Sequence, residues 1–523
     1  MIKSIEKYSP KERKLIMNKF LTGLTNATNY TMTENGAVTH KSTNSALLDM
    51  FALGGAYHHR SVEDTILLFK NAYEENPVYA LKCLFYFRDI LEGQGERKFF
   101  RVCTRWLASA HTDAMKRNLK YIPMFGRWDD LYAFVGTPLE ADTFNFMKEQ
   151  LALDVQSKTP SLLAKWLKSE NASSIETKRF GSLTRKYFGM THKEYRKVLS
   201  ILRERINVLE RLMSAGKWDA IEFDKIPSKA GLVYKNAFAR HDVERMKEAK
   251  ENVVSYADFA KDTTTKVNAK ALYPYEVVAE ALKLFRTGSY WSMKSLPPMD
   301  DTNRLMVNKY WDNLTDYFNG AAFNGIAVVD TSGSMVRNDA SAPINVAIAL
   351  GLYCAEKASG PFAGHYISFA SRPQLIKTEG VDFCDKVQRI YKTNLVDNTN
   401  IKATFDLILG TAIANNCSQE DLPQNVIVIS DMEFDYARTS GLHSRETLME
   451  GIAKRWAAHG YKMPNLIFWN VDARNNNIPM EVKDGISFVS GFSPVLFEQI
   501  MKGKTAFDLM MDKLNSKRYE AIC

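Results

Sequence analysis

Six consecutive residues near the middle of the chain, Asp330-Thr331-Ser332-Gly333-Ser334-Met335, combine a carboxylate with hydroxyl groups in a spacing suited to metal binding. They follow the apolar run Gly325-Ile326-Ala327-Val328-Val329, which predicts a buried strand. An open α/β sheet binds ligands at the carboxyl ends of its strands. Because Mg²⁺ prefers hard oxygen donors in octahedral geometry, the sequence predicts that Asp330, Ser332 and Ser334 hold Mg²⁺ or another divalent cation.

This D-x-S-x-S spacing closely resembles the metal-ion-dependent adhesion site of the von Willebrand factor A family. The resemblance implies that a Thr from a second loop and an Asp from the end of a later strand complete the site. Thr399, just before the amphipathic stretch 402–413, and Asp431, at the end of the apolar run 425–430, stand in that order. One coordination position would stay open, and an acidic residue of a protein partner could fill it.

Other interpretations of the same residues fit less well. Asp330 and Ser332 could simply cap the helix expected near Pro343. Aspartic proteases use D-T-G or D-S-G, whereas Ser332 here separates the Thr from the Gly, and phosphoaspartyl hydrolases need an acidic residue at position 332. Glu433 and Asp435 are the nearby carboxylates that a hydrolase would need as a base, and we expect them to be solvated or to support the ligands. The chain is therefore predicted not to be an enzyme.

The overall composition is that of an ordinary globular protein. The chain has 523 residues, of which 45% are hydrophobic and 25% charged, enough for two or three domains. Its N-terminus is charged, and no apolar run reaches the length of a membrane span. The six cysteines show no C-x-x-C spacing, which is typical of free thiols in a reducing compartment. We expect a cytoplasmic protein that makes no contact with a membrane.

Positive charge is concentrated in one region of the chain. The formal net charge is +9, to which residues 1–320 contribute +11 and residues 321–523 contribute −2. Residues 151–250 alone hold 21 basic and 12 acidic residues. A local excess of this kind is typical of a surface that binds a polyanion.

In the same region basic residues are interleaved with aromatic ones. Apolar residues from Tyr195 to Met213 recur at spacings of three and four, which predicts one amphipathic helix from His192 to Met213. Basic side chains contact phosphates, and aromatic faces stack on unpaired bases. The alternative is a solvated helix face whose aromatic residues belong to the core. The residues predicted to bind RNA are Lys165, Lys168, Lys178, Arg179, Arg185, Lys186, Lys193, Arg196, Lys197 and Arg203.

Turns and periodicity divide the chain into three parts and predict a multidomain α plus α/β protein. Residues 1–60 are polar and rich in turns, and we expect them to pack on the helical domain. Residues 61–320 show helical periodicity broken by short turns, which predicts an all-α, HEAT-like ring or solenoid of helical pairs. Residues 321–523 alternate strands with helices, which predicts a Rossmann-like, doubly wound parallel sheet.

Taken together, the two halves resemble the Ro autoantigen architecture, in which a TROVE module of helical repeats precedes a von Willebrand factor A domain. The chain looks more closely like an uncharacterised relative of that group. The segments that carry the resemblance span most of the chain: Thr33-Glu34-Asn35-Gly36-Ala37, Leu47-Leu48-Asp49-Met50-Phe51, Arg88-Asp89, Gly95-Glu96-Arg97, Tyr273-Pro274 and Asp330 to Met335.

The resemblance implies a non-enzymatic protein that binds small or misfolded non-coding RNA. A single-stranded end would enter the basic helical ring, and duplex portions would lie on its outer surface. The alternative function is that of a protein-assembly scaffold whose metal ion is coordinated by an acidic residue of a partner protein. RNA binding predicts an affinity that falls steeply with added salt, whereas the scaffold predicts a protein complex that a chelator dissociates.

Overall fold

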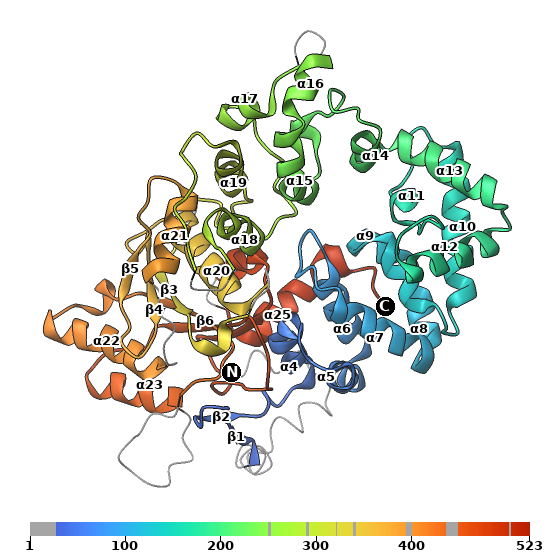
Figure 1. Cartoon of the computed structure of the whole chain (residues 1–523). Coiled ribbons are helices and arrows are strands. Elements are labelled where there is room, and N and C mark those ends of the chain that lie inside the picture. The colour runs from blue at the N-terminus through green and yellow to red at the C-terminus, as the bar shows by residue number, and fades with distance from the viewer. Residues whose placement is uncertain are drawn as a thin grey trace.

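The computed structural model consists of a helical part followed by a part built around one sheet (Figure 1). The structure describes residues 28–248, 253–288, 292–320, 322–337, 341–393, 400–435, 448–500 and 504–523. An N-terminal helical region and a C-terminal, mainly parallel sheet were both expected from the sequence. None of the described helices is long and apolar enough to cross a membrane.

The helical part consists of short helices joined by turns. Within its described residues it contains no strand apart from an isolated bridge between Arg286 and Met293. Its helices are α4 (Ala46–Leu53), α5 (Val62–Glu75), α6 (Pro77–Arg88), α7 (Lys98–Ala110), α8 (Thr112–Asn118), α9 (Ile122–Phe125), α10 (Glu140–Gln156), α11 (Leu163–Trp166), α12 (Ile175–Phe188), α13 (His192–Arg205), α14 (Leu209–Ser214), α15 (Ser228–Arg240), α16 (Asp242–Glu248), α17 (Tyr256–Lys261), α18 (Pro274–Phe285) and α19 (Thr302–Asp312).

The prediction of one helix from His192 to Met213 was wrong, because two helices share this stretch. The α13 helix begins as the sequence indicates, with Thr191 and Glu194 forming a reciprocal capping pair. It ends before Asn207, whose φ of 47° is left-handed. Since a left-handed residue does not continue a right-handed helix, α14 starts anew at Leu209.

The C-terminal sheet has six strands in the order β5-β4-β3-β6-β7-β8. All neighbouring pairs are parallel except β4 and β5, which run antiparallel at one edge. From β3 the chain proceeds to β4 on one side and later returns to β6 on the other, so the topology switches between β3 and β6. The strands are β3 (Gly325–Asp330), β4 (His365–Phe369), β5 (Leu375–Lys377), β6 (Asn425–Ser430), β7 (Asn465–Asn470) and β8 (Ile486–Ser490).

Helices cover the sheet and bury its central strands. Every residue of β3, β6 and β8 is buried, as expected for parallel strands with both faces covered. The helix α20 packs along β3 and β6 and is itself buried over most of its length. The helices of this part are α20 (Pro343–Lys357), α21 (Phe383–Thr393), α22 (Ile401–Ala414), α23 (Leu448–Ala458), α24 (Phe497–Ile500) and α25 (Ala506–Leu514).

Both ends of the helical part contact the sheet part, so the helices form a closed arc (Figure 1). At its start, α4 packs against β8 and α25. At its end, α18 packs against α20 and α21. Between these two contacts the chain curves through α10, α13 and α15. The HEAT-like character of the repeats stays a prediction.

The first described residues form a hairpin that lies on the sheet part. Its strands are β1 (Tyr30–Met32) and β2 (Val38–His40), and it is bridged to the C-terminal half at Gly36–Asp435 and His40–Ile478. The expectation that residues 1–60 pack on the helical domain therefore fails for this hairpin, although α4 does pack on α5. His40 pairs with Ile478, which is 438 residues further along the chain, and the residues around His40 give no indication of such a distant partner.

Candidate functional site

Four of the five residues predicted to bind a metal lie together at the carboxyl ends of β3 and β6. Asp330 is the last residue of β3, Asp431 directly follows β6, and both side chains are buried. The hydroxyl oxygens of Ser332 and Ser334, in the loop after β3, are 3.0 Å apart. This edge is the topological switch of the sheet, where the loops from two adjacent strands diverge and leave room for a ligand. The fifth residue, Thr399, lies outside the described residues.

Burial raises the pKa of both carboxyl groups. Removal from water is the main cause for Asp330, and the charge of Asp431 adds to it, so that the pKa of Asp330 reaches about 7. Burial also raises the pKa of Asp431, against the opposing effects of Arg474 and of a hydrogen bond with Ser334. Two adjacent buried carboxylates are unfavourable unless a positive charge offsets them. The cluster thus has both the oxygen donors and the charge that a divalent cation requires.

Two residues that the sequence analysis missed hold these carboxylates. Ser430 Oγ donates a hydrogen bond to Asp330 Oδ2 at 2.5 Å. Arg474 Nη2 donates to Asp431 Oδ2 at 2.9 Å. A signal for Arg474 was present, because it follows the apolar run 465–471 and so stands at the carboxyl end of the neighbouring strand β7.

Glu433 is held in place by hydrogen bonds from the N-terminal hairpin and from the loop after β7. The backbone amide of Glu34 donates to Glu433 Oε2 at 2.7 Å. Asn475 and Asn477 donate to Glu433 Oε1 at 2.8 and 2.9 Å. Each carboxylate oxygen therefore already accepts a hydrogen bond, and Glu433 joins three segments beside the metal cluster.

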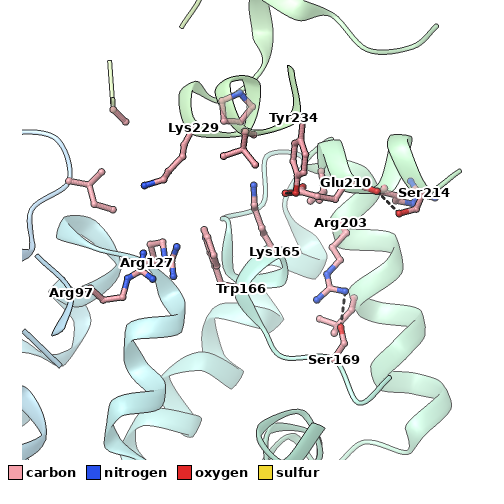
Figure 2. A pocket seen from close by; sticks show the side chains of 18 of the residues that line it. Arg97, Arg127, Lys165, Trp166, Ser169, Arg203, Glu210, Ser214, Lys229 and Tyr234 are labelled. Carbon is pink, nitrogen blue, oxygen red and sulfur yellow. Dashed lines mark hydrogen bonds between the residues drawn. The ribbon is translucent and has the colours of Figure 1, made fainter. Parts of the chain in front are cut away.

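A second candidate site is a cavity of about 1030 Å³ on the inner side of the helical arc. Figure 2 shows Lys229 and Tyr234 of α15 on one side and Arg127, Lys165 and Trp166 on the opposite side. Three acidic residues, Glu170, Glu210 and Glu276, are outnumbered by eight basic ones. The basic residues that line the cavity are Arg88, Arg97, Arg127, Lys165, Arg196, Arg203, Arg211 and Lys229.

Half of these basic side chains are neutralised by carboxylates. Arg88 pairs with Asp130 at 2.7 Å, and Arg127 pairs with Asp129 at 2.8 Å. The remaining pairs are Arg211 with Glu204 and Lys229 with Glu276.

The other four basic residues have no carboxylate partner among the described residues. Arg203 donates only to neutral groups, the carbonyl oxygens of Ala164 and Leu167 and the hydroxyl of Ser169. Lys165 and Arg196 likewise form no ion pair within the described ranges. The cavity therefore carries uncompensated positive charge, which is the property that attracts a polyanion.

Arg97 is the most distinctive of these four residues. Its guanidinium has no hydrogen bond or ion pair with any described residue. Partial burial lowers its pKa, and the neighbouring charges of Arg127, Arg88 and Arg101 lower it further. Asp129 and Asp130, which pair with Arg88, Arg101 and Arg127, offset part of this positive charge, and the net effect on the pKa of Arg97 is still a decrease.

An aromatic face lies next to this charge. The guanidinium carbon of Arg127 is 3.9 Å from the centroid of the Trp166 ring, and Lys165 Nζ is 5.7 Å from it. Trp166 is only partly buried, so one region of its ring faces the cavity. A flat aromatic surface flanked by cations is suited to a base with its attached phosphate.

The ten residues predicted to bind RNA fall into three groups in the structure. Lys165, Arg196 and Arg203 line the cavity. Two others are engaged internally, Lys168 with Asp129 at 3.6 Å and Arg185 with Glu170 at 2.9 Å. The remaining five are exposed and do not line the cavity: Lys178, Arg179, Lys186, Lys193 and Lys197.

Several cavity residues were not among those predicted. Arg88 and Arg97 flank the turn Gly93-Gln94-Gly95, which follows a helix and so lacks the context of a phosphate loop. Gly95 has a φ of 62°, and a side chain there would clash with Tyr273. Close packing of Gly95 against Tyr273 thus holds the turn that carries Arg97 at the cavity, and the Gly-Gln-Gly turn with its flanking arginines was the signal in the sequence.

Two family models match most of the chain. Residues 33–178 and 153–320 match a family model described as a domain of unknown function, DUF2828. Residues 324–521 match a second such model, DUF7788. The chain is 30% identical over 516 residues to the uncharacterized protein L728 of Acanthamoeba polyphaga mimivirus, covering 91% of this chain and 85% of that protein. An uncharacterised relative was expected from the sequence motifs.

Among solved structures, the chain is similar to the Ro (RSR) protein of Deinococcus radiodurans. The superposition covers 91% of this chain and all of that one, with 12% sequence identity and a TM-score of 0.36. The von Willebrand factor A and TROVE assignments stay predictions.

Proposed function

This chain belongs to the family of the domain of unknown function DUF2828, and we propose that it is a non-enzymatic RNA-binding protein. The observation that carries the proposal is the cavity, which is lined by Trp166 and by four cations without a carboxylate partner among the described residues, Arg97, Lys165, Arg196 and Arg203. Phosphates would contact the cations, and an unpaired base would stack on the ring. Single-stranded RNA offers both groups, since each nucleotide carries one phosphate and one base.

The proposed ligand is a small or misfolded non-coding RNA with a single-stranded segment. Duplex RNA hides its base faces, so only an unpaired end or loop can use Trp166. The five exposed basic residues outside the cavity, which include Lys178, Lys186 and Lys193, are available to duplex phosphates. We place this ribonucleoprotein in the cytoplasm, where such RNA is accessible.

We further propose that Asp330, Ser332, Ser334 and Asp431 bind Mg²⁺ or another divalent cation, with Thr399 as the expected fifth ligand. The buried carboxylates and hydroxyls at the switch of the sheet support this assignment. When bound, the ion would offset the paired carboxylates and leave a coordination position for an external oxygen ligand.

A binding role suits this cluster better than catalysis. Both oxygens of Glu433 already accept hydrogen bonds, and Asp431 is assigned to the ion, so neither carboxylate is available as a general base. The same cluster supports a second candidate function, a protein-assembly scaffold in which an acidic partner residue completes the coordination of the ion.

The test is direct binding of the full-length protein to a fluorescently labelled single-stranded RNA of 20 nucleotides, measured by anisotropy. We expect saturable binding that weakens steeply with added salt and exceeds binding to a duplex of equal length. No binding, or binding that is independent of salt, would refute the RNA proposal. The scaffold function is tested separately, by identifying proteins that copurify and are released by a chelator.

A further inference from the structure

Three residues from distant segments meet beneath the N-terminal hairpin, away from both sites described above. His40 is the last residue of β2, Glu450 lies in the first turn of α23, and Glu481 lies in the connection between β7 and β8. One ligand atom from each residue lies within 4.8 Å of the ligand atoms of the other two. One imidazole and two carboxylates are a donor set that transition-metal ions bind.

The imidazole of His40 lacks the hydrogen bonds that a buried histidine normally makes. Its side chain is 1% exposed, and neither Nδ1 nor Nε2 has a hydrogen-bond partner among the described residues. The nearest carboxylate oxygen, Glu450 Oε1, is 3.7 Å from Nε2, which is too long for a hydrogen bond. Buried polar groups are rarely left without a partner, and the ring nitrogens of His40 are available to a ligand.

We infer that His40, Glu450 and Glu481 bind one Zn²⁺ ion through one imidazole nitrogen and two carboxylate oxygens. Two ligands at about 2.1 Å from a tetrahedral Zn²⁺ ion are about 3.4 Å apart, close to the observed separation of His40 and Glu450. The carboxylate oxygen of Glu481 already lies within 4.8 Å of the donor atoms of His40 and Glu450, so a small movement brings the third donor within range. Water occupies the fourth position.

The ion would fasten the hairpin to the C-terminal part of the chain. The backbone of His40 already pairs with Ile478, with N–O distances of 3.0 Å in both directions. At its other end, the hairpin contacts Glu433 through the amide of Glu34. Zinc bound at His40 would therefore hold one end of the hairpin, while Glu34 at its turn contacts the carboxylate of Glu433 near Asp431. This role does not depend on whether the cavity binds RNA.

The experiment is a zinc titration of the full-length protein after dialysis against a chelator, monitored by competition with a chromophoric zinc indicator. The exposed Cys523 is changed to Ser throughout, so that its thiol does not bind the metal. With excess Mg²⁺ present to occupy the Asp330 cluster, we expect one equivalent of Zn²⁺ in this background and an affinity at least about 10-fold weaker in Glu450→Gln and Glu481→Gln. Glu420→Gln, a change at an exposed glutamate of the same part of the chain, is the matched control and should bind as the parent does.

Hydrogen–deuterium exchange provides a second readout that does not require a stable His40 variant. Zinc should slow amide exchange in residues 30–40 of the parent and of Glu420→Gln, but not in Glu481→Gln. Parent-like zinc binding in Glu481→Gln, or no tight binding by the parent protein, would overturn the inference.

Discussion

Replacing Arg97 by Gln tests whether the cavity binds phosphates. Arg97 forms no ion pair with any described residue, so the substitution removes a positive charge without breaking an internal contact. It also relieves the mutual repulsion with Arg127, Arg88 and Arg101 that lowers the pKa of Arg97 beyond the effect of its burial. The variant should therefore fold at least as stably as the parent while binding RNA more weakly.

The magnitude follows from the number of unpaired cations in the cavity. With four phosphate contacts, a single-stranded RNA should show a slope of log K against log salt of about −2.8. Its affinity should then fall about 50-fold between 50 and 200 mM salt. With three contacts, the slope becomes about −2.1 and the fall about 20-fold. At constant salt, the lost contact should weaken binding by about 1.5–3 kcal/mol, the net contribution of one charged hydrogen bond.

The assay is fluorescence anisotropy of a labelled single strand at a series of salt concentrations. Arg117→Gln is the matched control, because Arg117 is an exposed arginine of α8 that does not line the cavity. Equal salt slopes for Arg97→Gln and the parent would show that RNA does not contact the cavity at Arg97. An equal loss of RNA affinity in Arg97→Gln and Arg117→Gln would show the same.

Three further predictions concern stacking, the metal and pH. Trp166→Ala should weaken RNA binding by about 1–3 kcal/mol without changing the salt slope, because it removes a stacking face but no charge. Anisotropy titrations at several salt concentrations measure the affinity and the slope. Asp330→Asn should weaken Mg²⁺ binding at least about 10-fold in calorimetric titration while the circular dichroism spectrum is retained. Burial would raise the pKa of Glu96, but His58 and backbone amides lower it from 4.5 to about 2. Ionised Glu96 therefore stabilises the fold above pH 4.5, and this contribution, on the order of 3 kcal/mol, is lost as the pH falls towards 2. In urea unfolding, the free energy of unfolding of the parent should decrease over this pH range by that amount more than that of Glu96→Gln.

Residue spacing in the sequence was enough to predict most of the candidate metal cluster. Asp330, at the end of β3, is followed directly by the loop that holds Ser332 and Ser334, so the proximity of the three residues follows from a short stretch of chain. Asp431 was found because it ends another apolar run, and parallel strands end at the same edge of a sheet. Arg474 was missed although its position after β7 is equivalent, because an arginine among carboxylates does not suggest a metal site.

For the basic region 151–250, the sequence predicted the charge but few of the residues that line the cavity. Composition located a surplus of charge in residues 151–250, yet only three of the ten residues selected there line the cavity. Arg185 and Lys168 are occupied by Glu170 and Asp129, and sequence proximity does not reveal such pairs. Arg97, just before α7, and Lys229 of α15 line the same cavity although they are more than 100 positions apart in the sequence.

The sequence by itself determined the local structure: the buried strands, most helix starts, the order of a helical part and a sheet part, and the D-x-S-x-S loop. These features depend on neighbouring residues, whose periodicity and capping groups can be read directly. Only the tertiary structure decided which distant segments meet, as with Asp330 and Asp431, Arg97 and Lys229, or His40 and Glu450. Such contacts depend on the packing free energy of the whole chain, and that energy leaves no pattern in any single stretch of residues.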